Sequence, residues 1–180
     1  MSYGLYVVLW VVSNKMINVI KKFQLSFFLL FFLNLAGQTE KDTVIPEQRG
    51  HISDFEGIYS PAQIDTLDSL IVDFEKRTTI QIAIITIDTT MMRKEDLDSW
   101  TLKVGNAWGV GQKGKNNGIL IGISVGYRIM RIQNGYGIEK KLSDQETKEI
   151  IDNDFVPFFK EARFFEGTRN GLKALMKKLE

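Results

Sequence analysis

The stretch Ile80–Ile87 (IQIAIITI) decides the fold, because it has the pattern of a strand that is buried on both faces. It is rich in β-branched residues and almost continuously apolar, as is typical of a central strand covered on each side. A second run of this kind, residues 119–125 (ILIGISV), follows after a segment with helical spacing. We therefore expect two parallel neighbouring strands that are joined by a crossover helix.

A third strand is expected directly after the second. Gly126 permits a tight turn between residues 119–125 and residues 127–133 (YRIMRIQ), so these two strands should form a hairpin. The third strand then runs antiparallel to the other two, and the sheet is mixed.

Helical patterns surround these strands. Ser60-Pro61-Ala62-Gln63 combines an N-cap serine, a proline at the first helical position and a glutamine three residues after the cap, which predicts a helix up to about Arg77. Further helices are expected over residues 94–108, from Ser143 to a break near Pro157, and from about Gly167 onward. This order of elements predicts an α/β fold with a mixed central sheet covered by helices.

The composition argues against several classes of site. The chain has no cysteine, which removes disulfides, thiolate nucleophiles and cysteine-based metal sites. His51 is the single histidine, which argues against a serine triad or a multi-histidine metal site. Site chemistry must therefore come from carboxylates, amides, hydroxyls, lysine or arginine, and the oxygen-bearing groups among these suit hard, oxygen-binding cations.

The first 37 residues have the pattern of a secretory signal. Lys21 and Lys22 precede the apolar run Phe23–Leu35, and the small residues Ala36 and Gly37 follow it. An uncleaved anchor is the alternative. A second apolar patch lies before Met16, and translation that starts at Met16 would explain it.

We expect three parts in the chain: a signal sequence over residues 1–37, a linker over residues 38–50 and one domain over residues 51–180. The mature protein is expected to be exported, periplasmic or secreted, without a stable membrane span, and anchored only if the signal stays uncleaved. Residues 1–37 hold three lysines and no acid, so the rest of the chain carries a net charge of −2. With this net charge, the rest of the chain has no excess of basic residues for binding nucleic acid.

Polar loops are expected to meet at one edge of the sheet. Because the first two strands are parallel and the third runs back, the start of the second strand and the end of the third lie at the same edge. The residues gathered there are Asn116, Asn117 and Gly118 from one loop, Gly135, Tyr136, Gly137 and Glu139 from the other, and Asp144 at the start of the next helix.

These residues offer oxygen ligands to a hard divalent cation, and calcium matches them best. Gly135 and Gly137 allow the loop to turn its carbonyls inward or to admit a ligand close to the backbone. A second interpretation stays open, in which the glycines and asparagines only form turns and the acids are solvated or cap helices. No strict calcium-loop spacing is present to decide between the two.

Short motifs follow one another in a definite order along residues 50–180. They are Ile52-Ser53-Asp54, Trp108-Gly109-Val110-Gly111, Asn116-Asn117-Gly118, Gly135-Tyr136-Gly137-Ile138-Glu139 and Leu142-Ser143-Asp144. In this order the chain resembles the TPM domain family, and the combination is much more specific than any one motif.

The resemblance implies a three-layer α/β/α sandwich that is exported or tethered to a membrane. Similar domains are associated with calcium binding, with acid phosphatase activity and photosystem II repair in the chloroplast lumen, and with accessory roles at receptors. Carried over by motif, the metal ligands are Asp54, Asn116, Asn117, Glu139 and Asp144, and the loop-shaping residues are Gly118, Gly135, Tyr136 and Gly137. Relatives often have Asp-Asn where this chain has Asn116-Asn117, so one charge is missing and calcium should bind more weakly.

Three functions are compatible with these observations. The first is a calcium-binding module outside the cytoplasm that acts on a protein partner in the cell envelope. The second is a metal-dependent acid phosphatase that hydrolyses phosphate monoesters, which rests on the resemblance alone because the sequence shows no nucleophile motif for it. The third is an assembly factor that needs no metal.

Overall fold

The computed structural model describes residues 44–180. The expected signal sequence, its alternative start at Met16 and the first part of the expected linker lie outside these residues. Within the described part of the chain, no helix has both the length and the apolar character that a membrane span requires.

A mixed sheet of four strands forms the centre of the described domain. The strands are β1 (Ile52–Asp54), β2 (Gln81–Thr86), β3 (Gly118–Ser124) and β4 (Ile129–Asn134), and they lie in the order β1-β2-β3-β4. The first three run parallel and β4 runs antiparallel to β3. The predicted parallel pair and the predicted hairpin are thus confirmed, while β1 is an edge strand that the sequence did not reveal.

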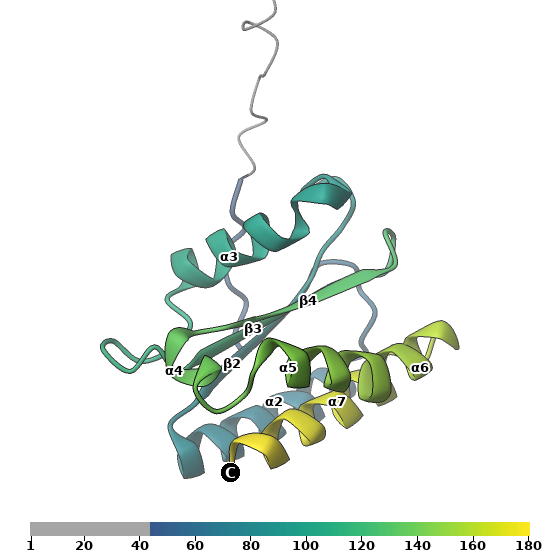
Figure 1. Cartoon of the computed structure of the whole chain (residues 1–180). Coiled ribbons are helices and arrows are strands. Elements are labelled where there is room, and N and C mark those ends of the chain that lie inside the picture. The colour runs from purple at the N-terminus through teal and green to yellow at the C-terminus, as the bar shows by residue number, and fades with distance from the viewer. Residues whose placement is uncertain (1–43) are drawn as a thin grey trace, which may run out of the picture. The chain divides into compact units, whose positions relative to one another are not determined.

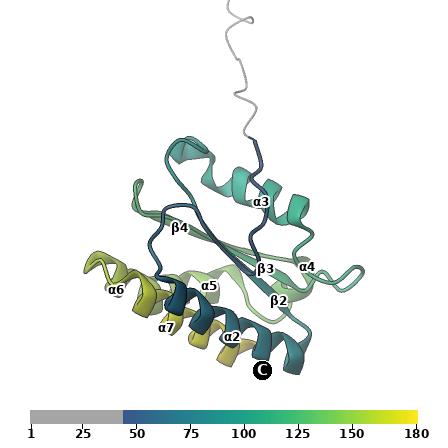
Figure 2. The ribbon, with the colours of Figure 1, turned by 180° about the vertical axis from the view of Figure 1, so that it is seen from behind.

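Helices cover both faces of this sheet (Figures 1 and 2). The helices are α2 (Pro61–Thr78), α3 (Leu97–Trp108), α4 (Tyr136–Glu139), α5 (Asp144–Ile150), α6 (Val156–Lys160) and α7 (Phe164–Leu179), with the 3₁₀ turn η2 (Lys94–Asp96) before α3. Helix α3 lies on one face, and α2, α5 and α7 lie on the other. The expected three-layer α/β/α sandwich is confirmed.

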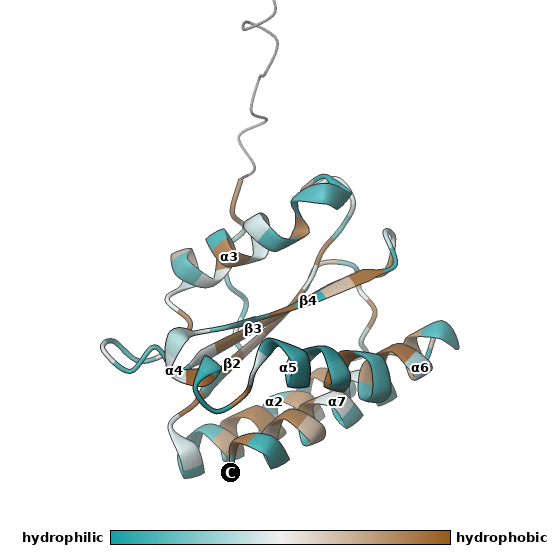
Figure 3. Ribbon diagram, viewed as in Figure 1, coloured by the Kyte–Doolittle hydropathy of each residue, from teal (hydrophilic) through white to brown (hydrophobic). Residues whose placement is uncertain are grey.

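Alternation along β2 divides the core between the two faces. Ile82 and Ile84 join the cluster under α2 and α7, and Ala83 and Ile85 join the cluster under α3, where Trp100 is buried. Strands β2 and β3 are accordingly apolar along most of their length, whereas the helices are apolar only on their inner faces (Figure 3). This is the reason that IQIAIITI lacks a polar side.

Two capping boxes begin helices where the sequence predicts them. At α2 the Ser60 side chain accepts the backbone N–H of Gln63, and the Gln63 side chain accepts the backbone N–H of Ser60. Ser143 and Glu146 form the same reciprocal pair at α5. Each pair satisfies two donors that the first turn of a helix otherwise leaves unpaired.

The predicted break near Pro157 is wrong. Helix α5 continues through a π-helical turn, η3 (Ile151–Phe155), into α6, and the Val156 N–H donates to the carbonyl of Ile151. Pro157 lies in the first turn of α6, where the wider turn before it accommodates a residue without an N–H. The helical run ends only at Lys160, and α7 begins at Phe164 rather than near Gly167.

Candidate functional site

The loops before β3 and after β4 meet at the amino edge, which is the edge of the sheet at which β2 and β3 begin. Gln81 in β2 pairs with Gly118 in β3, and Asn134 at the end of β4 pairs with Ile119. The Gly135 N–H donates to the Gly118 carbonyl at 2.9 Å. The sequence predicted this convergence from the strand directions alone.

Contacts between backbones determine the shape of the amino edge. The Gly137 N–H donates to the carbonyl of Asn116 at 2.9 Å. A Cβ at Gly135 would lie 2.4 Å from that same carbonyl oxygen, and a Cβ at Gly137 would lie 2.2 Å from the carbonyl oxygen of Lys115. Both glycines are therefore required by close approach of the two loops, and the segment that follows Gly135 forms the short helix α4 where a loop was expected.

Asn117 joins the amino edge to the start of β2. Its side chain is buried, its Oδ1 accepts the Gln112 N–H at 2.8 Å, and its Nδ2 donates to the carbonyl of Thr79. Its own carbonyl accepts the Gln81 N–H at 3.1 Å. The amide of Asn117 thus holds two loops together.

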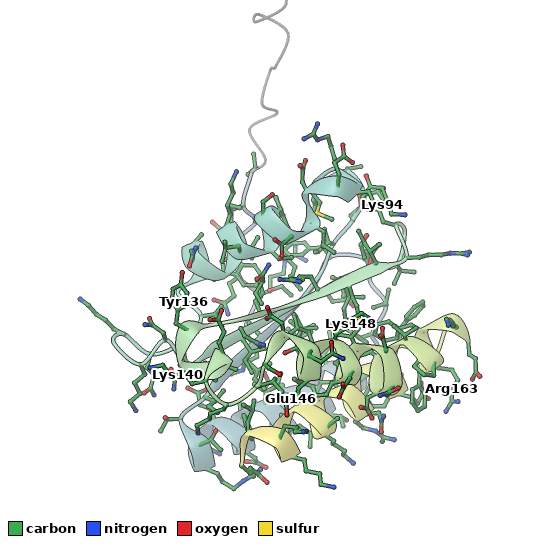
Figure 4. The ribbon with its side chains drawn as sticks, in the orientation of Figure 1. Lys94, Tyr136, Lys140, Glu146, Lys148 and Arg163 are labelled. Carbon is green, nitrogen blue, oxygen red and sulfur yellow. The ribbon has the colours of Figure 1, made fainter. Side chains whose placement is uncertain are left out.

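Asn116 differs from Asn117 in its exposure and in its backbone conformation. It is exposed and its φ is 49°, a left-handed conformation that asparagine tolerates better than most residues. The neighbouring Tyr136 begins α4 and is 75% exposed. Figure 4 shows Tyr136 and Lys140 at the amino edge, far from Arg163 at the other end of the molecule.

Glu139 and Asp144 are exposed residues of the same edge. Glu139 ends α4, and Asp144 is the first residue of α5, where a negative charge favours the helix. Glu146 in the same turn accepts the backbone N–H of Ser143 and lies beside Lys178, and these contacts lower its pKa to about 2. The loop from α4 to α5 is thereby fixed by Glu146 rather than by Asp144.

Asp54 lies at the carboxyl edge, which is the opposite edge of the sheet, where β1, β2 and β3 end. It pairs with Thr86, the last residue of β2, and this places it about 16 Å along the strand from Gln81. Its carboxylate accepts the Tyr59 N–H at 2.9 Å and the Thr86 hydroxyl at 2.6 Å. One ion cannot contact both Asp54 and Asn116, and Asp54 instead closes the loop that leads into α2.

Glu56 is a second carboxylate of the carboxyl edge, and the sequence did not single it out. Its two oxygens accept the N–H groups of Val125 and Gly126 at 2.9 and 3.0 Å, which fixes the turn between β3 and β4. Because these partners of Glu56 are 69 and 70 residues away in the sequence, no local pattern predicts the contacts. Tyr59 lies nearby, and its burial, together with the charges of Asp54 and Glu56, raises the pKa of its phenol above the usual range.

The residues predicted as metal ligands do not form one coordination group. Within residues 44–180, no three histidine, aspartate or glutamate side chains are arranged to hold a metal ion. The Asn117 amide is already used in hydrogen bonds, and Asp54 lies at the other edge. Asn116, Glu139 and Asp144 remain as exposed oxygen donors at the amino edge.

Comparisons with known proteins agree with the fold. A family model described as the TPM domain (TPM_phosphatase) matches residues 52–178. The N-terminal domain of a protein from P. gingivalis has a similar structure, with a TM-score of 0.65 and 28% identity over 71% of this chain and 80% of that one. No curated protein matches the chain.

Two more solved structures share the fold. The BA42 protein from Bizionia argentinensis is 22% identical, with a TM-score of 0.61 over 69% of this chain and 83% of that one. The N-terminal domain of the cg2496 protein from Corynebacterium glutamicum is 16% identical, with a TM-score of 0.57 over 75% of this chain and 84% of that one. At these identities the likeness concerns the fold alone.

The two asparagines are expected to respond differently to substitution. Asn117→Ala should lower the free energy of unfolding by about 2 kcal/mol, because it leaves the Gln112 N–H and the Thr79 carbonyl without partners. Asn116→Gly is the matched control and should change that free energy by less than about 0.5 kcal/mol, since glycine accepts a positive φ. Urea denaturation measures both. Equal losses in the two variants would contradict the separate roles.

Proposed function

The chain belongs to the TPM domain family, and on this premise we propose that it is an exported binding or assembly module that docks onto a protein partner in the cell envelope. The apolar run that follows Lys21 and Lys22 supports export to the periplasm or beyond, with anchoring if the signal is not cleaved. The docking surface is the amino edge, where Asn116 and Tyr136 are exposed.

The exposure of Tyr136 carries this proposal. An aromatic side chain that is 75% exposed contacts water at a cost, yet Tyr136 lies on loops whose backbones are fixed to each other by the bonds of Gly135 and Gly137. A tyrosine on a fixed backbone has only two side-chain torsions to order on binding, and tyrosines are enriched among the residues that dominate protein interfaces. Tyr136 therefore supplies a ready anchor for a partner.

Calcium is proposed to bind weakly at the same edge. Asn116, Glu139 and Asp144 are exposed there and would hold the ion, whereas Asn117 and Asp54 are engaged elsewhere. Two carboxylates and one amide are a small ligand set for calcium, so the affinity should be low. The ion would add positive charge beside Tyr136 and so favour an acidic surface on the partner.

A photoreactive amino acid in place of Tyr136 tests the docking surface. In cells that naturally produce the protein, irradiation should yield a discrete adduct from position 136. The same probe in place of Lys94, which is exposed at the start of η2, is the matched control and should yield none. Adducts of equal yield at both positions, or none at position 136, would refute docking at the amino edge.

Calcium titration followed by amide NMR tests the ion. The amides of Asn116, Glu139 and Asp144 should shift together, while that of Gly126 at the distant turn stays unchanged. Asp144→Asn should weaken the response without loss of fold, because Glu146 fixes this helix end. Shifts centred on Asp54 and Glu56 would place the ion at the carboxyl edge and overturn this part of the proposal.

Metal-dependent hydrolysis of phosphate monoesters is the second candidate function, and the description of the matching family model favours it. A phosphatase of this kind would lose its activity with a chelator and in the Asp144→Asn variant, in parallel with the NMR response to the ion. Activity in a simple aryl phosphate assay that survives both treatments would rule out this mechanism. A metal-loaded protein that hydrolyses no monoester leaves the binding module as the function.

A further inference from the structure

A groove of about 660 Å³ opens at the end of the domain that is opposite to Tyr136. It lies between the turn of the β3–β4 hairpin and the corner at which α6 meets α7. Figures 1 and 2 agree that the tip of the hairpin and α6 lie at the same end of the molecule. Pockets that hold small molecules commonly have volumes of about 300–1,000 Å³, so the groove is large enough for one.

The interior of the groove is apolar. Ile123 is buried at its base, Met130 forms the wall on the hairpin side, and Val156, Phe159 and Phe164 form the wall on the helix side. Phe159 packs edge-on against Phe155 and is tilted against Phe164, with ring centroids 5.9 and 5.6 Å apart. These contacts between the rings fix the helix wall.

Two cationic side chains border this apolar interior. Arg128 comes from the hairpin turn and Lys160 from the end of α6, and both are exposed. Within residues 44–180, neither forms an ion pair, and no acidic residue lines the groove. Glu56 contacts the same turn, where its two carboxylate oxygens accept the N–H groups of Val125 and Gly126.

We propose that this groove binds an amphipathic monoanion of the fatty-acid type, with its unbranched apolar chain along Ile123, Met130 and Phe159 and its carboxylate between Arg128 and Lys160. The apolar walls match a hydrocarbon chain and the two cations match one anionic head group. A hydrocarbon chain requires no hydrogen-bond partner from these walls, and the two cations supply partners for the head group.

The hydrocarbon chain and the carboxylate should each have a separate, measurable effect on the affinity. Each further methylene group that enters the groove should raise the affinity about fourfold, until the groove is full. The head group should contribute about tenfold, through hydrogen bonds to charged partners. Affinity must therefore depend both on chain length and on charge.

The experiment titrates the purified protein with octanoate, decanoate and dodecanoate below their micellar concentrations and follows amide NMR shifts. The affinity should rise along the series, with shifts at residues 123–130 and 156–164. The double variant Arg128→Gln with Lys160→Gln should bind dodecanoate about tenfold more weakly. The matched control, Lys94→Gln with Lys140→Gln, removes two exposed lysines elsewhere and should bind as the unmodified protein does (Figure 4).

Several results would overturn the proposal. Acetate that binds as tightly as dodecanoate would show a site for small anions only. Dodecanol that binds as tightly as dodecanoate would show that Arg128 and Lys160 do not recognise the head group. Shifts outside the groove would place the ligand elsewhere, and binding of an extended apolar peptide without binding of any fatty acid would assign the groove to a protein partner.

Discussion

The close contact between the loops of the amino edge is the constraint on which the rest of the structure depends. Gly118, Gly135 and Gly137 each bring their backbone so near to a carbonyl oxygen that a side chain has no room. Asn117 adds hydrogen bonds from its buried amide to both neighbouring segments. Together these contacts position the start of β3 next to the start of β2, and they bring the chain after β4 back to the same edge. They also keep Tyr136 exposed.

The two edges of the sheet use their polar groups for different purposes. At the amino edge the N–H groups of Gly135 and Gly137 are bonded to the facing loop, and the side chains of Tyr136, Glu139 and Asp144 are exposed. At the carboxyl edge Asp54 and Glu56 fix loops, because the carboxylate of each accepts backbone N–H groups. A carboxylate in a family motif can thus be structural, and its exposure and hydrogen bonds distinguish that role from ligand binding.

Patterns within the sequence predicted those elements whose signals are local. The run IQIAIITI, the turn at Gly126 and the caps at Ser60 and Ser143 each depend on neighbouring residues, and the structure has them where expected. Other features arise from tertiary contacts that leave no such pattern. Strand β1 has three residues, Glu56 bonds to residues far along the chain, and the groove forms only where α6 and α7 pack beside the hairpin. The strand directions located the amino edge, but they could not show that the Asn117 amide is buried.

Native-state hydrogen exchange of the Gly135 and Gly137 amides tests the central claim most directly, which is that the amino edge is a rigid frame for Tyr136. Both amides donate to carbonyls of the facing loop, so they should exchange as slowly as the Ile121 amide in the middle of β3. In the Asn117→Ala variant both should become faster together. Exchange of the two glycine amides at the rate of an open loop such as that around Lys113, in the unmodified protein, would contradict the account.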